Sequence, residues 1–586
     1  MGIMPVMMRV FEKCKDQYRQ RYPERELRIL TSLPETVVSK LLTLILLPCL
    51  SLECCYNLIG YQGHGLAAVV PNGVHYKYGC LELFLSDLAR LDFGHPVMDD
   101  LAAVFCQIFY PGRGNLLTYW DYCVKPLWTK YPQPKSKVTR IGRVMACTKM
   151  LFVHGPDGHP LYLVERLGDT DLKDDLPKAQ DAFTAATGRK TRVCVIDREG
   201  NGLDLALSGA QCHPPHSYLT MLDKNQYKSL KDFKVTTPWQ PLDDLGKPHL
   251  QIAWAYWQSA AKRQRDPRRF FLVRPVDKSP SRLAVGCICQ PPSSWHASDA
   301  YAIYHGRWAN QEHRFREMHQ MALSANYGYL RANIPNRTAQ RRFAAAQKRV
   351  EATQHQLITN QHRLDYQANR IARWTTHFEL RWTTRCTLCR ELHHRLQNMP
   401  ESLTRLHAQR RLARFQAECQ ADVLSHQQRL TTIQNKDLVP LQRKRAQLET
   451  RLVKRQKAVN TVSLDSPFYE RNLNKDLVMM ICKMILLNAH YYVQEHFCVS
   501  EEWQKAEFAT LRAHLYQKPG LIRVWAERVE VVLKPYRYAH LQQYAEESCR
   551  LFNAALLQDE HGRCIVMRVA ASEQEFVDWG GTPTQG

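Results

Sequence analysis

Two kinds of segment are missing from this chain of 586 residues. No apolar run is long enough to cross a bilayer: the longest, Leu41–Leu52, has about twelve residues and contains Pro48, whereas a spanning helix needs about 20. The start of the chain shows no apolar segment ahead of a cleavage site, as an export signal would. The sequence therefore predicts a core helix at Leu41–Leu52, no membrane partner and a location inside the cell.

The cysteines and the overall composition exclude further classes of protein. The 19 cysteines are odd in number and scattered along a long chain, which is typical of free thiols in a reducing cytosol and not of a disulfide framework. A hydrophobic share of 45% with 10% aromatic residues excludes a mainly disordered or fibrous chain. At about 100–200 residues per domain, the length predicts three to five structural units.

The chain is rich in positive charge, and most of that charge lies in one block that lacks glycine. Lys and Arg number 80 against 56 Asp and Glu, which gives a net charge of +24 and a pI near 9.3. Residues 336–460 hold 25 Lys and Arg against 9 Asp and Glu, no glycine, and only Pro400 and Pro440. Such a concentration of one sign predicts a polyanionic partner.

An apolar residue recurs at every seventh position through the first part of this block. The recurring residues are Phe343, Val350, Leu357, Leu364, Ile371 and Phe378. These heptads predict a long helix with a left-handed coiled-coil seam. The seam is imperfect because its companion positions are mostly polar. The pattern breaks at 398–402, and further basic helices are expected at about 402–435 and 441–459, so the block is predicted to be an antiparallel helical hairpin.

The charge of this hairpin has two interpretations. It is either the solvated face of a coiled coil or a surface that binds nucleic acid. A solvated face normally mixes both signs, whereas this block is nearly three to one basic, so we favour DNA binding. The candidate contacts nearest the start of the block are Arg341, Arg342, Lys348 and Arg349.

Four regions are expected along the chain: a helical N-terminal region that binds DNA (1–110), an α/β core (111–335), the basic hairpin (336–460) and a small α+β C-terminal region (461–586). In the core, strands are predicted at Leu116–Trp120, Lys149–His154, Pro160–Glu165, Thr191–Asp197 and Ser217–Leu222, with helices at Asp171–Thr187, Gly202–Ala210 and Arg307–Leu323. The order β-β-β-α-β-α-β followed by a helix is that of a ribonuclease-H-like core, in which the first and fourth strands are neighbours. Residues 225–300 are expected to form a β-rich insertion, with strands at Arg269–Arg274 and Leu283–Cys289.

Three acidic residues occupy special positions in this order. Asp121 ends the predicted first strand, Asp197 ends the fourth, and Glu312 lies on the late helix at a spacing that places it with Trp308 and Phe315. Two divalent metal ions that activate water and stabilise a leaving oxygen need carboxylates converging from separate elements, and Mg²⁺ prefers oxygen ligands. The three residues together therefore predict a two-metal site, although each alone has an ordinary structural explanation.

At these residues the sequence resembles the DDE transposases of bacterial insertion sequences, in particular a group with an "FDREG" strand and an "RW-x-x-QEN" helix. The matching segments are VIDREG at 195–200 and RWANQEH at 307–313. The family's first aspartate commonly sits in "DGH-x-x-P", and here Asp121 and Pro126 are kept without the Gly-His pair. The likeness runs over about residues 70–350.

This resemblance implies hydrolytic nicking at transposon ends followed by strand transfer into target DNA, with Asp121, Asp197 and Glu312 holding two Mg²⁺ or Mn²⁺ ions. It also implies that Tyr304 and Arg307 of a "Y-x-x-R-x-x-x-E" helix, and Arg198 beside Asp197, contact DNA. In that signature the glutamate follows the arginine by four residues, where this chain has Gln311. Such enzymes act as dimers on paired DNA ends, and a cytoplasmic, nucleoid-associated bacterial protein is expected.

Several alternatives remain beside this interpretation. A catalytically inactive DNA-binding descendant of a transposase would explain the altered motifs, and a purely structural coiled-coil protein would explain the hairpin but not the carboxylates. Asp157 sits in a Gly-Pro-Asp-Gly turn where turn chemistry favours Asp, and Asp223 is an auxiliary acid outside the triad. Cys386, Cys389, His393 and His394 suggest zinc less strongly, because all four fall on one predicted helix.

Overall fold

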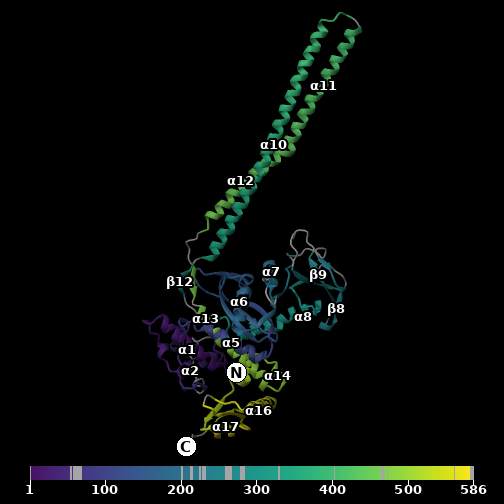
Figure 1. Ribbon diagram of the computed structural model, residues 1–586. Coiled ribbons are helices and arrows are strands. Elements are labelled where there is room, and N and C mark those ends of the chain that lie inside the picture. The colour runs from purple at the N-terminus through teal and green to yellow at the C-terminus, as the bar shows by residue number, and fades with distance from the viewer. Residues whose placement is uncertain are drawn as a thin grey trace. The chain divides into compact units, whose positions relative to one another are not determined.

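The computed structural model describes residues 2–52, 56, 67, 69–198, 202–211, 215–223, 226, 233–257, 267–276, 284–327, 330–334, 336–401, 403–462, 468–471, 473–559 and 561–580. The chain divides into two compact units (Figure 1). Unit 1 comprises Met1–Ile334 and Phe468–Gly586, and unit 2 comprises Pro335–Pro467. The N-terminal and C-terminal regions, which the sequence suggests as separate regions, therefore share unit 1 with the α/β core.

An eleven-stranded mixed sheet forms the centre of unit 1. Its core strands are β1 (Asn115–Pro126), β3 (Arg143–His154), β4 (Pro160–Leu167), β5 (Lys190–Ile196) and β6 (Ser217–Met221). β3 pairs antiparallel with β1 and β4, whereas the β1–β5 and β5–β6 pairs are parallel. The first and fourth core strands are thus neighbours, as the sequence predicts. The crossovers to β5 and β6 contain α6 (Leu172–Thr187) and α7 (Leu203–Gln211).

The β-rich insertion extends this same sheet. Its strands are β7 (Phe233–Val235), β8 (Gln240–Leu242), β9 (Lys247–Trp257), β10 (Arg268–Pro275) and β11 (Ala284–Cys289). β11 pairs antiparallel with β6, and β10 and β9 follow in order. The two strands predicted in the insertion are confirmed as β10 and β11, and each is buried along most of its length.

Helices from both ends of the chain pack around the sheet. The N-terminal ones are α1 (Ile3–Arg21), α2 (Pro34–Leu46), α4 (Tyr78–Arg90) and α5 (Gly94–Phe109). α13 (Leu473–Phe497) contacts α2, α4, α5 and β4. In the described part of the chain α13 is the one helix long and apolar enough to cross a membrane, although Lys483 interrupts its apolar run and so hides it from a count of uninterrupted runs; 83% of its apolar window is buried, so it serves as a core helix.

A fully buried ion pair ties β1 to α13. Lys125 Nζ lies 3.0 Å from Asp476 Oδ1, and both side chains are completely buried. The same Oδ1 accepts a hydrogen bond of 2.8 Å from the backbone nitrogen of Tyr327. Charges this deep are tolerated only when they are paired and hydrogen-bonded, so the pair fixes β1 against the helix.

A three-stranded sheet and a two-stranded sheet complete unit 1. The three strands are β14 (Gly520–Val524), β15 (Arg528–Leu533) and β16 (Cys564–Val569). β15 and β16 are parallel and connected through α16 (Ala539–Ala554), so this part of the predicted α+β C-terminal region is a β-α-β unit. Elsewhere, β12 (Leu330–Ile334) pairs antiparallel with β13 (Phe468–Arg471), so the chain leaves for unit 2 and returns from it on adjacent strands.

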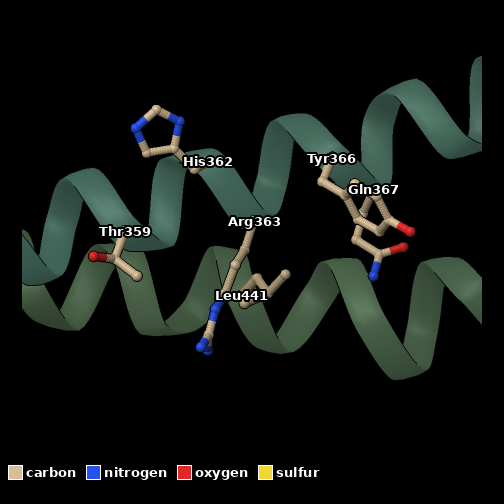
Figure 2. Close-up of a pocket in the computed structure, with 6 residues that line it drawn as sticks. All are labelled: Thr359, His362, Arg363, Tyr366, Gln367 and Leu441. Atoms are coloured by element: carbon tan, nitrogen blue, oxygen red, sulfur yellow. The ribbon is translucent and has the colours of Figure 1, made fainter.

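Unit 2 is a helical hairpin. α10 (Arg337–Gln397) runs along one arm, and α11 (Leu403–Ile433), a π-turn (Gln434–Leu438) and α12 (Val439–Asn460) form the other. Two heptad residues, Val350 and Leu364, are buried, and so are the polar companions Thr353 and Asn360. The Asn360 side chain donates a 3.0 Å hydrogen bond to the carbonyl of Leu441 on α12, which satisfies its amide inside the seam. Next to this contact lies a hollow lined by Thr359, His362, Arg363, Tyr366, Gln367 and Leu441 (Figure 2).

Two buried histidines make unit 1 sensitive to acid. Burial, reinforced by the charge of Arg314, lowers the pKa of His154 on β3 and of His490 on α13 to about 3. The unfolded chain binds a proton at each near pH 6.5 and the folded chain only near pH 3, so stability falls as the pH falls through this window, by about 1.4 kcal/mol per pH unit for each histidine. We expect His154→Leu to flatten this dependence. Urea denaturation at pH 7 and pH 5 measures it, and an unchanged slope would contradict the assignment.

Candidate active site

The register of two parallel strands brings Asp121 and Asp197 together. Trp120 of β1 is paired with Ile196 of β5, and each aspartate is the next residue along its strand. The prediction that Asp121 ends its strand is wrong: β1 continues to Pro126 because it still pairs with β3 beyond the last β5 pair, Asp121 facing Phe152. Asp121 therefore lies inside a strand and is held by its pairing with β3, whereas Asp197 follows the end of β5.

Glu312 reaches the same place by means of a π-turn. The late helix begins earlier than predicted, as α8 (Ala297–Arg307), and a π-turn (Trp308–Glu312) connects it to α9 (His313–Gln320). A π-turn accommodates one more residue than an α-turn, so the fifth residue after Arg307 takes the place that the fourth would have in a regular helix. This accounts for the extra residue between Arg307 and Glu312 relative to the transposase helix signature.

The neighbours of Glu312 differ from those that its spacing suggested. Trp308 is 74% exposed, so the predicted apolar face shared by Trp308, Glu312 and Phe315 is wrong, because the π-turn breaks the regular helical phase. Gln311, at the signature position of the glutamate, is fully buried. Glu312 therefore meets a charged partner and not an apolar surface.

That partner is Arg307, whose guanidinium contacts all three carboxylates. Nη1 lies 2.9 Å from Glu312 Oε1 and 3.2 Å from Asp121 Oδ2, and Nη2 lies 3.5 Å from Asp197 Oδ1. Three acidic side chains from β1, from the end of β5 and from the late helix thus converge on one positive charge. The sequence predicts Arg307 on this helix as a DNA contact, and it does not predict the central place of Arg307 among the acids.

Burial and charge together tune this group. The Arg307 side chain is only 13% exposed, and those of Asp121, Glu312 and Asp197 are 20%, 34% and 41% exposed. Burial, together with the charges of Asp197 and Glu312 and against the opposing charge of Arg307, raises the pKa of Asp121 to about 7. Any further positive charge brought to the group would stabilise the ionised form of the Asp121 carboxyl.

The residues predicted to contact DNA form two sets. Tyr304 lies one turn before Arg307 on α8, with the guanidinium 5.8 Å from its ring, and its hydroxyl interacts with Arg198. Arg198 also pairs with Asp223 at 3.3 Å, so the auxiliary acid lies beside the triad and outside it. The hairpin residues form the second set, on α10 in unit 2: Arg341, Arg342, Lys348 and Arg349, all exposed.

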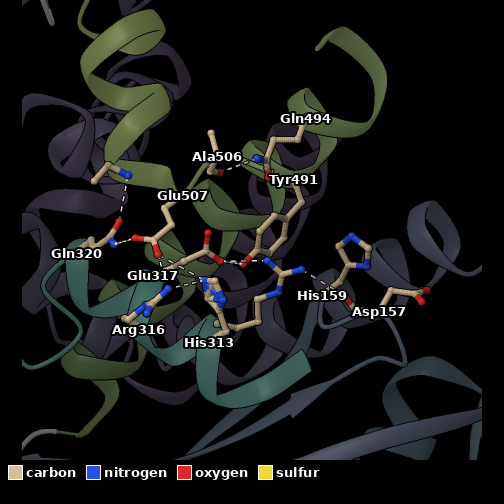
Figure 3. Close-up of polar contacts among 12 residues, drawn as sticks. Asp157, His159, His313, Arg316, Glu317, Gln320, Tyr491, Gln494, Ala506 and Glu507 are labelled. Atoms are coloured by element: carbon tan, nitrogen blue, oxygen red, sulfur yellow. Dashed lines mark hydrogen bonds and ion pairs between the residues drawn. The ribbon is translucent and has the colours of Figure 1, made fainter. Parts of the chain in front are cut away.

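A buried polar network holds the helix that follows Glu312 (Figure 3). Arg314 Nη1 donates to Glu317 Oε2 at 3.1 Å, and Tyr491 of α13 donates to the same oxygen. Further along, the amide of Gln320 donates to Glu507 Oε2 at 2.6 Å. These contacts anchor α9 to α13 and to the segment before α15 (Phe508–Leu511), and so limit the freedom of the π-turn.

Two alternative sites do not gather a comparable group. Asp157 lies in the turn between β3 and β4, where its carbonyl accepts a 3.4 Å contact from Arg314. Cys386, Cys389, His393 and His394 line a hollow on the hairpin. As the side chains stand, no three His, Cys, Asp or Glu residues in the described ranges are close enough to hold a metal ion, and this includes the Asp121 triad, where Arg307 intervenes.

The donor set of the triad nevertheless suits a hard divalent cation. It offers only carboxylate oxygens, from three separate elements, and Mg²⁺ and Mn²⁺ prefer such ligands. The position at which they converge already attracts a cation, since it holds the guanidinium of Arg307. Glu199 and Gly200 of the VIDREG segment lie outside the described residues.

Comparison with known proteins returned structural likeness only. No protein-family model and no curated protein matches this sequence. One similar solved structure is a transposase. It is the cryo-EM structure of a piggyBac transposase synaptic complex with hairpin DNA, with a TM-score of 0.32 and 9% sequence identity over 54% of this chain and 68% of that chain. A likeness this distant carries no argument about this site, which rests on its own geometry.

Proposed function

We propose that this protein is a DDE-type transposase related to those of bacterial insertion sequences, which nicks DNA at transposon ends and transfers the cut strand into target DNA. The observation that supports it is the convergence of Asp121, Asp197 and Glu312 on one cation-binding position. The ribonuclease-H-like arrangement of β1 beside β5 gives the first two acids their common edge. The expected location remains cytoplasmic and nucleoid-associated.

In this proposal the three carboxylates hold two Mg²⁺ or Mn²⁺ ions. Such ions activate water and neutralise charge on the leaving oxygen of a phosphodiester. Asp121 is positioned by its place inside β1, and Glu312 by the π-turn and the network behind α9. Tyr304 and Arg307 lie on the same side of α8 and would contact the DNA backbone when Arg307 leaves the acids.

In the same proposal the basic hairpin binds DNA without regard to its base sequence. Its exposed cations neutralise phosphates and release counterions, so binding is expected to weaken steeply with salt. A homodimer on paired transposon ends would place two such hairpins on DNA. Incubation with supercoiled DNA that carries the flanks of the gene tests the activity: nicking that requires Mg²⁺ or Mn²⁺ and stops with EDTA is expected, and no nicking under any metal would exclude the enzyme.

A catalytically inactive DNA-binding descendant is the second candidate, and one observation favours it. The three acids are already neutralised in part by Arg307. A side chain that permanently fills the cation position would leave DNA binding intact and remove cleavage.

Replacement of Arg307 separates the two candidates. We expect Arg307→Gln to strengthen Mn²⁺ binding about tenfold, because the variant removes a positive charge that competes for the same carboxylates. Isothermal titration calorimetry on the full chain measures the affinity, and Arg198→Gln is the matched control because Arg198 pairs with Asp223. Mn²⁺ binding by the variant but not by the natural protein would favour the inactive descendant. Equal affinities would contradict the competition.

A further inference from the structure

A second basic surface lies on unit 1, directly after the strand that carries Asp121. Residues 122–156 contain seven Lys and Arg and no Asp or Glu. Lys125 and Lys149 are buried, whereas the five between them are exposed: Lys130, Lys135, Lys137, Arg140 and Arg143. We name residues 127–144 the flap. Its charge is of one sign and faces solvent, which distinguishes it from the mixed surface of a typical globular unit.

The flap also exposes two large aromatic side chains. Trp128 is 81% exposed and Tyr131 is 52% exposed. Large aromatic residues normally bury most of their surface, and exposed ones gathered with other functional groups mark interaction sites. Two exposed aromatic side chains among five exposed cations form a combination suited to nucleic acid, since bases stack on aromatic rings and phosphates meet cations.

The backbone of the flap holds these side chains in a defined arrangement. β2 (Lys135–Val138) pairs antiparallel with the start of β3 at the edge of the sheet, with Lys137 opposite Val144. Residues alternate between the faces of a strand, so Lys135 and Lys137 share one face while Val138, only 2% exposed, anchors the other. Gly142, at φ +71°, closes the turn that carries Arg140 and Arg143.

The flap is connected to the candidate active site through the last five residues of β1. It begins one residue after β1 ends, and β1 carries Asp121. At its other side, Arg140 Nη1 lies 3.5 Å from Nδ1 of His319, on the helix that follows Glu312. At about 3.3 Å per residue, the strand spans roughly 20 Å from Asp121 to the start of the flap, a distance that a few nucleotides of a DNA strand at the triad would cover.

We propose that the flap binds unpaired nucleotides of the DNA next to the cleavage site, with Trp128 and Tyr131 stacking on bases and the flap cations holding phosphates. This inference rests on the proposed transposase function and specifies the form of its substrate. Bases inside an intact duplex are already stacked on their neighbours, so exposed ring faces select a single-stranded segment or an opened end. The flap thus discriminates by strand state and not by base sequence.

The test compares two labelled oligonucleotides, a blunt duplex and the same duplex with a single-stranded tail, bound to the full chain in EDTA. We expect Trp128→Ala/Tyr131→Ala to weaken binding of the tailed DNA about tenfold or more and to leave the blunt duplex nearly unchanged. Lys135→Gln/Lys137→Gln should reduce the slope of log affinity against log salt by about 1.4 for the tailed DNA. The proposal would be overturned if the aromatic variant bound each DNA as tightly as the natural protein does. It would also be overturned if the lysine variant left the salt slope unchanged.

Matched variants control for general effects on the fold and on charge. Trp525→Ala removes a 47% exposed tryptophan between β14 and β15, and Lys173→Gln/Lys178→Gln removes two exposed lysines from α6. All should bind tailed DNA like the natural protein. Asp197→Asn keeps the two proposals apart: it should retain tailed-DNA binding if the flap acts as described, whatever the outcome for cleavage.

Discussion

Asp197→Asn is expected to reduce metal-dependent nicking by about 10³-fold or more while DNA binding and thermal unfolding stay close to those of the natural protein. The carboxylate is 41% exposed and makes one long contact with Arg307, so its charge contributes little to the fold. Its loss removes one of the three acids that the proposed metals require, and metal stabilisation of a phosphodiester transition state contributes several kcal/mol.

The measurement is the initial rate of conversion of supercoiled to nicked DNA at saturating Mg²⁺ and Mn²⁺. Asp223→Asn serves as the matched control, because Asp223 lies beside the triad, is similarly exposed, and pairs with Arg198. We expect that variant to retain most of the rate. An Asp197→Asn protein that nicks like the natural one would show that these acids do not form the active site.

Asp476→Asn is expected to lower the free energy of unfolding of unit 1 by about 3–5 kcal/mol, the largest effect on stability that we foresee. The substitution leaves the ammonium of Lys125 buried without its counter-charge, 0% exposed in a strand of the central sheet. Lys125→Met/Asp476→Leu removes both charges together and should recover most of the loss, since buried ion pairs are often replaceable by apolar side chains of similar size.

Urea denaturation monitored by circular dichroism measures this effect, and the double variant completes the mutant cycle. The surface pair of Arg9 and Asp100, 70% and 41% exposed, is the control, and Asp100→Asn should cost at most about 1 kcal/mol. If Asp476→Asn unfolds at the same urea concentration as the natural protein, the pair is not the anchor described here.

The sequence predicts the core strands because each contains a short apolar run, and one of these runs leads directly to an acid. Val193–Ile196, for example, is buried along its whole length and leads directly to Asp197. The heptads likewise predict α10, with its end at Gln397. In both cases the pattern is local, and local periodicity is what a single sequence reports well.

The direction in which the Glu312 side chain points could not be predicted in the same way. Nothing in the amino acids of residues 307–313 distinguishes a π-turn from an α-helix, and the helix that follows the turn is held by contacts from distant elements, such as Tyr491 on Glu317. The pairing of β11 with β6 and the buried partnership of Lys125 with Asp476 are also non-local. The central place of Arg307 is non-local too, since it brings together acids from β1, from the end of β5 and from the late helix.

The adjacency of β12 and β13 has a topological consequence. Ile334 and Phe468 are paired across these two strands, so unit 2 is inserted into the sequence of unit 1 between two adjacent strand ends. The entropy of closing a loop rises only with the logarithm of its length, so an insertion of this size places little demand on its host. The architecture of unit 1 is therefore complete without unit 2. A tight turn could join β12 to β13, and helical hairpins of other lengths could be accepted between the same two strands.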